Sequence, residues 1–105
     1  MRQTCAVICR YYLTGDWKFI NSDEIVFKRI MGGLSNYLYY AGLPNKDDQS
    51  GEPTELLLRF YGNNHDGEKE NIFNELIIFT ILSERNLGPK LLGVFPGGRI
   101  EEFLH

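Results

Sequence analysis

Alternation of apolar and polar positions dominates the chain and predicts a series of short β-strands. Leu56, Leu58 and Phe60 occupy every second position of residues 55–61, which is the two-residue period of a strand with one buried face. Similar patterns, bounded by glycine, proline and polar residues, predict five strands in all, over residues 25–31, 36–43, 55–61, 90–95 and 99–104. Gly32-Gly33 separates the first two strands, and Pro96-Gly97-Gly98 predicts a hairpin between the last two.

Two other segments have the spacing of helices. Residues 4–13 predict a short helix that ends at Gly15 and brings Ala6, Cys9, Tyr12 and Leu13 to one side. Trp17 follows in an expected loop and is expected to pack this helix onto the rest of the protein. Residues 69–86 predict the longest helix. Asp66 is its candidate N-cap, and Leu87-Gly88-Pro89 is its expected end.

The order of these elements indicates the fold class. Most connections are short, including the polar loop over residues 44–53, and short connections favour antiparallel pairing. The one connection long enough for a crossover is the helix between the third and fourth strands. We therefore expect an α+β fold, with an antiparallel sheet of about five strands, one long helix and a short N-terminal helix.

Composition narrows the class of protein. The 105 residues are 43% hydrophobic and 24% charged, which predicts one globular domain over residues 1–105. The net charge of −3 and the scattered Lys18, Lys28 and Arg29 provide no basic surface for nucleic acid. No apolar run reaches the roughly 18 residues of a membrane span. Cys5 and Cys9 lie near no other metal-ligand pattern, so we expect reduced thiols, no metal site in this chain and a cytoplasmic protein.

The segment Gly32-Gly33-Leu34-Ser35-Asn36 allows two interpretations. Its glycines could expose successive backbone N–H groups to phosphate oxygens, with Ser35 and Asn36 as further donors. They could equally just close a hairpin. The Gly-Lys-Ser/Thr ending of a Walker A loop is absent, so the pentapeptide alone does not decide.

Arg59 and Glu75 form a second candidate pair. Arg59 lies among apolar strand residues, where it either reaches solvent or binds an anion with its bidentate fork. Glu75 lies in the long helix beside Ile72, Ile78 and Phe79, where a carboxylate is costly unless it is paired. Either Glu75 pairs with Arg59, or it lies at the rim of the apolar face and meets water.

The last strand carries the third candidate. Glu102, Phe103 and Leu104 end the chain before His105 and are explained by an ordinary edge strand. In a nucleotide site, the same strand could offer backbone N–H and C=O groups to an adenine ring.

Taken in order, GGLSN, LLRFYG, ENIF and ILSERNLGPKLLGVFPGGRIEEF resemble the N-terminal lobe of choline/ethanolamine kinases, and the choline kinase branch above all. This family shares the protein-kinase-like fold. The resemblance implies that Gly32 to Asn36 form the ATP phosphate loop and that Arg59 reaches the ATP phosphates. It implies that Glu75 positions Arg59 and that Glu102, Phe103 and Leu104 form the hinge near adenine. Family members phosphorylate choline, and often ethanolamine, with Mg-ATP on the way to phosphatidylcholine, and commonly form cytoplasmic homodimers.

The chain departs from the family in one large respect. The family's catalytic His-x-Asp motif, its magnesium ligands and its choline pocket belong to the C-terminal lobe, and no His-x-Asp occurs here, since His65 directly precedes Asp66. We therefore expect an N-terminal lobe without catalytic residues or metal ligands of its own, inactive when alone because phosphoryl transfer requires both. Two alternatives remain: a non-catalytic dimerisation or regulatory partner of a full-length kinase, and a generic α+β binding module.

Overall fold

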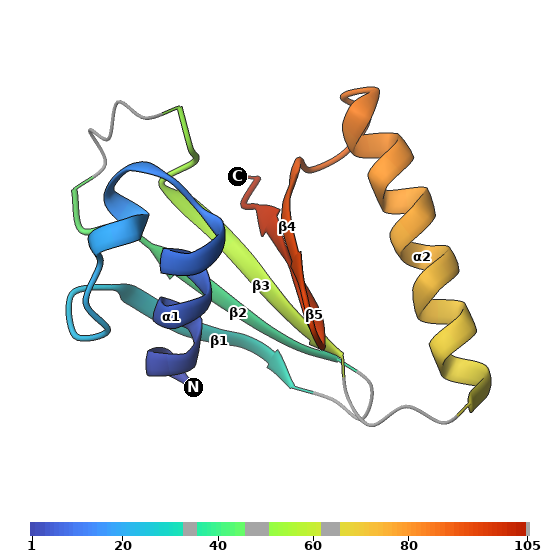
Figure 1. Ribbon diagram of the computed structural model, residues 1–105, viewed down its shortest axis with the longest axis horizontal. Helices are drawn as coiled ribbons and strands as arrows, with labels where there is room; N and C mark the ends of the chain where they lie inside the picture. Colours follow the sequence, from blue (N-terminus) through green and yellow to red (C-terminus); the bar gives the residue numbers. More distant parts are fainter. Residues whose placement is uncertain (33–35, 46–50, 62–65, 105) are drawn as a thin grey trace.

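The computed structural model describes residues 1–32, 36–45, 51–61 and 66–104, with the side chains of residues 31–32, 36, 66–73 and 75 outside that description. The described residues form two α-helices, a short 3-10 helix and five strands (Figure 1). In chain order they are α1 (Arg2–Tyr12), η1 (Gly15–Phe19), β1 (Val26–Gly32), β2 (Asn36–Gly42), β3 (Glu55–Tyr61), α2 (Asp66–Glu84), β4 (Leu91–Phe95) and β5 (Gly98–Glu102).

The five strands form a single sheet in the order β1-β2-β3-β5-β4. Every neighbouring pair is antiparallel. The long helix is the connection between β3 and β4. The predicted α+β class, with an antiparallel five-stranded sheet, one long helix and a short N-terminal helix, is confirmed.

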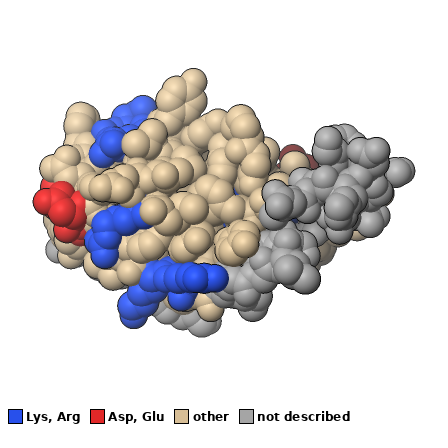
Figure 2. All heavy atoms as spheres, turned by 90° about the horizontal axis from the view of Figure 1, so that it is seen from below, with Lys and Arg blue, Asp and Glu red and all other residues tan. Residues whose placement is uncertain are grey.

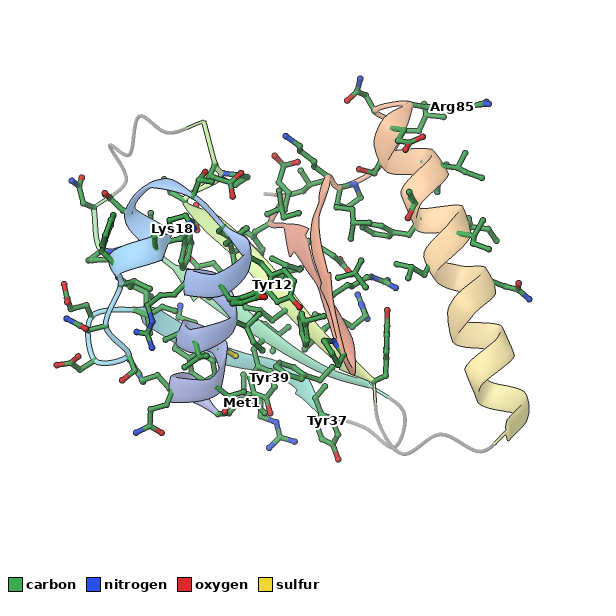
Figure 3. The ribbon with its side chains drawn as sticks, in the orientation of Figure 1. Met1, Tyr12, Lys18, Tyr37, Tyr39 and Arg85 are labelled. Carbon is green, nitrogen blue, oxygen red and sulfur yellow. The ribbon has the colours of Figure 1, made fainter. Side chains whose placement is uncertain are left out.

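The core lies between α1, η1 and one face of the sheet (Figure 1). Cys5, Cys9 and Leu13 from the helix side meet Leu56, Leu58 and Ile100 from the strands, and all six side chains are almost completely buried. Figure 3 shows Tyr39 in the sheet below α1 and Tyr12 at the end of that helix. The aliphatic positions that alternate along β3 therefore account for the buried face, as the two-residue period predicts.

Trp17 fixes the segment that follows α1. The expected loop is a turn of 3-10 helix, and the indole is fully buried. Its Nε1–H donates to the carbonyl oxygen of Pro53 at 2.8 Å, which satisfies the polar end of an otherwise apolar side chain. The expected packing of Trp17 onto the rest of the protein is confirmed.

The boundaries of α2 differ from those expected. The helix begins at Asp66 rather than Lys69, so Asp66 is its first residue and not a cap that precedes it. It ends at Glu84, because Asn86 adopts a left-handed φ of 58°. The N–H groups of Asn86 and Leu87 donate to the carbonyls of Ser83 and Leu82 at 3.1 and 2.9 Å, the two bonds of a Schellman motif. Asparagine therefore ends this helix, ahead of Leu87-Gly88-Pro89.

The long helix stands beyond the β4 edge of the sheet, away from α1 (Figure 1). It contacts β4, and Arg85 marks its far end (Figure 3). Four of its apolar side chains remain between 39% and 59% exposed, and they are Ile77, Ile78, Ile81 and Leu82. We call these four residues the α2 apolar row. In the part of the chain that the structure describes, no helix is long and apolar enough to span a membrane.

Candidate functional site

Side chains of opposite character alternate between the two faces of the sheet. In β3, Leu56 and Leu58 point into the core, so Leu57 and Arg59 belong to the other face. Arg59 is paired directly with Arg99 of β5, and the residues two apart on one strand share a face. Arg59, Arg99 and Glu101 therefore lie together on the face opposite the core, which we call the polar face.

These three side chains form an ion cluster. Oε2 of Glu101 accepts hydrogen bonds from Nε of Arg59 at 2.9 Å and from Nε of Arg99 at 2.7 Å. The carboxylate side chain is 4% exposed and that of Arg99 is 3% exposed, whereas that of Arg59 is 25% exposed. Arg59 is thus the member of the cluster that reaches the surface.

Arg99 is anchored from several directions. Its Nη1 donates to the hydroxyl of Tyr61 at 3.2 Å, and its guanidinium carbon lies 4.5 Å from the ring centroid of Phe79 on α2. Burial lowers the pKa of Arg99, but the hydrogen bond and the charge of Glu101 outweigh burial and hold the pKa above its ordinary value. Arg99 is therefore a permanent buried cation that links β5 to α2.

A hollow of about 220 Å³ opens at the other end of the sheet. It is lined by Lys28, Ile30, Tyr40, Glu55 and Phe103. The Tyr40 hydroxyl donates to Oε2 of Glu55 at 2.5 Å, and the Tyr40 and Phe103 rings meet edge to face with centroids 5.2 Å apart. Two aromatic rings, a carboxylate and a cation suit a flat heterocycle with polar edges.

The hollow and the ion cluster share the polar face. Tyr40 is paired with Leu57, which precedes Arg59 by two residues on β3. Along that strand, Glu55 and Arg59 are separated by four residues, or about 13 Å at the rise of a strand. This separation is of the order of the length of an extended nucleoside triphosphate, so one such ligand could reach both places.

The predicted phosphate loop is described only at its ends. Gly32 is the last residue of β1 and Asn36 the first of β2, and the two strands pair up to Gly32 and Tyr37. The segment therefore connects two antiparallel neighbours. Gly33, Leu34 and Ser35, like the side chain of Asn36, lie outside the described residues, so their role stays a prediction.

The partner described for Arg59 is Glu101, which the sequence did not suggest. Glu75 belongs to α2, as expected, but its side chain lies outside the description. Its pairing with Arg59 remains a prediction. A signal for Glu101 was available, since Arg99, Ile100 and Glu101 alternate in a predicted strand and two charges on one face of a strand need partners.

The expected hinge differs from its prediction in one respect. The last strand ends at Glu102 rather than Leu104. The N–H groups of Glu102 and Phe103 already donate to the carbonyls of Lys90 and Glu55, at 2.9 and 3.3 Å. These two donors are therefore engaged within the fold, and the ring of Phe103 is what this segment contributes to the hollow.

The described charges do not suggest a metal centre or a continuous basic surface. Among the described residues, no group of three or more His, Cys, Asp or Glu side chains is placed to hold a metal ion. Seen from below, the Lys and Arg side chains of the described surface occupy separate places rather than one strip (Figure 2).

Comparison with known proteins decides the family. The model of the choline/ethanolamine kinase family matches residues 27–105. The chain belongs to the choline/ethanolamine kinase family. A choline/ethanolamine kinase of Rattus norvegicus is 45% identical over 97 residues, which cover 91% of this chain and 24% of the relative. Choline kinase A2 of Caenorhabditis elegans is 38% identical over 105 residues, or 99% of this chain and 24% of the relative.

Solved structures agree with this family. The crystal structure of a choline kinase from Cryptosporidium parvum matches with a TM-score of 0.75 and 33% identity, over the whole of this chain and 27% of that one. The Plasmodium vivax ethanolamine kinase matches with a TM-score of 0.55 and 27% identity, over 95% of this chain and 24% of that one. The chain thus spans about a quarter of the length of the choline/ethanolamine kinases that it matches.

Proposed function

We propose that this chain is the nucleotide-binding N-terminal lobe of a choline/ethanolamine kinase. Such a kinase transfers the γ-phosphate of ATP to choline, and to ethanolamine in many members, on the way to phosphatidylcholine. The observation that carries the proposal is the polar face, on which the surface cation Arg59 and the aromatic hollow lie along one strand. Family membership supports the same assignment.

In this proposal each part of the polar face has its own role. The adenine ring enters the hollow beside Tyr40 and Phe103, and residues 102–104 form the hinge next to it. The phosphates extend toward Arg59, whose guanidinium matches phosphate geometry. Gly32 to Asn36 cover the phosphates, and Glu75 contributes to the position of Arg59.

Binding ATP does not suffice for phosphoryl transfer. The reaction requires a base at the acceptor hydroxyl and charge stabilisation around the transferred group. The described residues offer neither a metal-ligand group nor the family's His-x-Asp motif. We therefore propose that the catalytic residues, the magnesium ligands and the pocket for choline or ethanolamine belong to a C-terminal lobe, and that the 105-residue chain alone is inactive. Cytoplasmic homodimers, common in the family, are part of this proposal.

A second candidate function is that of a non-catalytic partner that dimerises with a full-length kinase and regulates it. The α2 apolar row favours this candidate, because it leaves a contiguous apolar surface that another protein surface could cover. This candidate predicts co-purification with a longer relative and a change in its activity on co-expression. The lobe proposal predicts neither.

The proposed site is tested by calorimetric titration of the 105-residue chain with ATP and with adenosine. We expect tighter binding of ATP, and we expect Arg59→Ala to weaken ATP binding about ten- to a hundredfold, as for a hydrogen bond to a charged group. Arg85→Ala, at the exposed end of α2, is the matched control and leaves both affinities unchanged. Equal affinities for ATP and adenosine would refute the proposal and favour a module without a nucleotide site.

The proposed inactivity is tested separately. The pure chain is incubated with magnesium, ATP and choline, and ADP release is followed with and without choline. We expect no choline-dependent release. Release that disappears in Arg59→Ala would show that the chain carries its own catalytic residues.

A further inference from the structure

We propose that Glu101 is a positioning residue for Arg59, and that Arg99 holds Glu101 in place, so that Arg59 presents its guanidinium to the nucleotide phosphates. This inference rests on the proposed function, because it assigns Arg59 to the phosphates. It concerns a carboxylate on β5 rather than one on the long helix.

The contact between Glu101 and Arg59 restricts the guanidinium at one end. Glu101 accepts from Nε of Arg59, which is one of the five N–H donors of a guanidinium. A hydrogen bond at Nε uses one of these donors and does not involve the four N–H groups of the two terminal nitrogens. Because the carboxylate is 4% exposed and Arg59 is 25% exposed, the fixed end of the contact is buried and the other end reaches the surface. Glu101 thus limits how the guanidinium can turn.

The carboxylate of Glu101 is itself held by a second contact. Its Oε2 also accepts a hydrogen bond from Nε of Arg99 at 2.7 Å, and the side chains of Arg99 and Glu101 are 3% and 4% exposed. Because this second contact is buried, it fixes the position of the carboxylate that Arg59 meets.

Arg99 supports the contact and does not itself meet a ligand. Its side chain is 3% exposed and is enclosed by Tyr61 and the Phe79 ring. These contacts hold Arg99, Arg99 holds Glu101, and Glu101 holds Arg59. Phe79 belongs to α2, so the position of the long helix is connected to the guanidinium on β3.

A purely structural cluster is the competing explanation. Buried ion pairs are often no more stabilising than apolar side chains of similar size, so stability alone gives little reason for two cations and an anion here. The two explanations differ in what they predict for ligands. A positioning role changes the affinity for phosphate and leaves the affinity for the base unchanged.

The experiment compares Glu101→Gln with Glu84→Gln, an exposed position at the end of α2. Calorimetry gives the affinities of each chain for ATP and adenosine, and thermal unfolding reports whether each is folded. We expect Glu101→Gln to lose about tenfold or more in ATP affinity with adenosine unchanged, and Glu84→Gln to match the wild type. An unchanged ATP affinity, or an equal loss for both ligands, would overturn the positioning role.

The affinities distinguish a failure of the proposed function from a failure of the inference about Glu101. If the wild-type chain itself binds ATP no better than adenosine, the nucleotide site falls and this inference falls with it. If the wild type prefers ATP and Glu101→Gln keeps the same preference, only the inference about Glu101 falls.

A measurement on the wild-type chain covers the case in which Glu101→Gln does not fold. The Nε–H resonance of Arg59 is assigned in a ¹⁵N spectrum through its loss in Arg59→Lys. We expect that proton to exchange slowly with water at neutral pH, because Glu101 accepts it at a buried position, and to remain protected when ATP is added. Exchange as fast as that of an exposed arginine would overturn the proposal.

Discussion

The guanidinium carbon of Arg99 on β5 lies 4.5 Å from the centre of the Phe79 ring on α2. This contact joins the long helix to the polar face of the sheet, at a buried cation that is also bound by Glu101. Elsewhere α2 contacts β4, and its apolar row is exposed. Phe79 is therefore placed to control how firmly the helix is held.

Replacement of Phe79 tests that control. Phe79→Leu keeps an apolar side chain but removes the aromatic ring, and a desolvated contact between a cation and a ring is worth about 2 kcal/mol. We expect faster amide hydrogen exchange along α2, with little change in β1 and β2. Ile78→Leu, an exposed neighbour, is the control and should leave exchange unchanged. Equal exchange in Phe79→Leu and wild type would show that the contact does not hold the helix.

Gly98 occupies a position where β3 and β5 approach too closely for a side chain. A Cβ atom there would overlap the backbone oxygen of Arg59 and lie 2.6 Å from Cζ of Phe95. Since the backbone oxygen cannot move without shifting the strand, Gly98→Ala should destabilise the fold by about 1–3 kcal/mol. Urea unfolding measures the loss.

The matched substitution is Gly88→Ala, where the atom nearest to the new Cβ is the Cβ of Leu82, at 3.8 Å. That distance is an ordinary van der Waals contact, so we expect the midpoint of urea unfolding to be close to that of the wild type. Similar midpoints for both alanine variants would mean that β3 and β5 separate without cost.

Asn86 ends the long helix in a left-handed conformation, with φ at 58°. Asparagine tolerates this region and glycine adopts it freely, whereas a β-branched side chain is strained there. Asn86→Gly should therefore retain the stability of the wild type, and Asn86→Val should lose about 1–2 kcal/mol. Thermal unfolding of the two variants checks the order, and an equally stable valine variant would contradict it.

The two thiols of α1 predict a dependence on alkaline pH. Burial raises the pKa of Cys5 and of Cys9 from 9.0 to about 12, and for Cys9 the nearby Cys5 adds to the increase. The folded chain therefore holds these protons between about pH 9 and 12, where the unfolded chain has released them. The contribution of the two thiols to the free energy of unfolding is therefore complete below pH 9, and it is lost as the pH rises toward 12.

Two measurements follow for these thiols. At pH 8, a disulfide reagent such as Ellman's should label the folded chain far more slowly than the chain in urea, because neither thiol is ionised or accessible. The Cys5→Ala/Cys9→Ala variant should show a shallower fall in stability between pH 9 and 12 than the wild type. Immediate labelling of the folded chain, or identical slopes, would contradict this account.

The sequence predicted the strands well where the apolar alternation was regular. The predicted boundaries of β3, at Glu55 and Tyr61, match the structure, because Leu56, Leu58 and Phe60 recur at every second position between Pro53 and Gly62. The ends of α2 were harder to predict. Asp66 begins the helix, and Asn86 rather than Gly88 takes the left-handed position, since several residues in each place satisfy the same capping rules.

Only part of the candidate site was predicted, and the reason differs from that for the helix ends. Arg59 was found because a cation among aliphatic strand residues is conspicuous in any sequence. Glu101 and Arg99 were missed, because their importance depends on which strand lies next to β3. The chain order suggests β4 as the neighbour, whereas the sheet places β5 there. Pairing between distant segments is not encoded in local spacing.

The ion cluster also has a consequence for how the sheet assembles. If β5 slipped by one residue against β3, Ile100 would turn to the polar face, and Arg99 and Glu101 would enter the core beside Leu58. Burying these two charges without their partners in an apolar core would cost far more free energy than the slipped pairing could regain. The cluster therefore excludes the slipped pairing during folding and specifies a single register for the central strands.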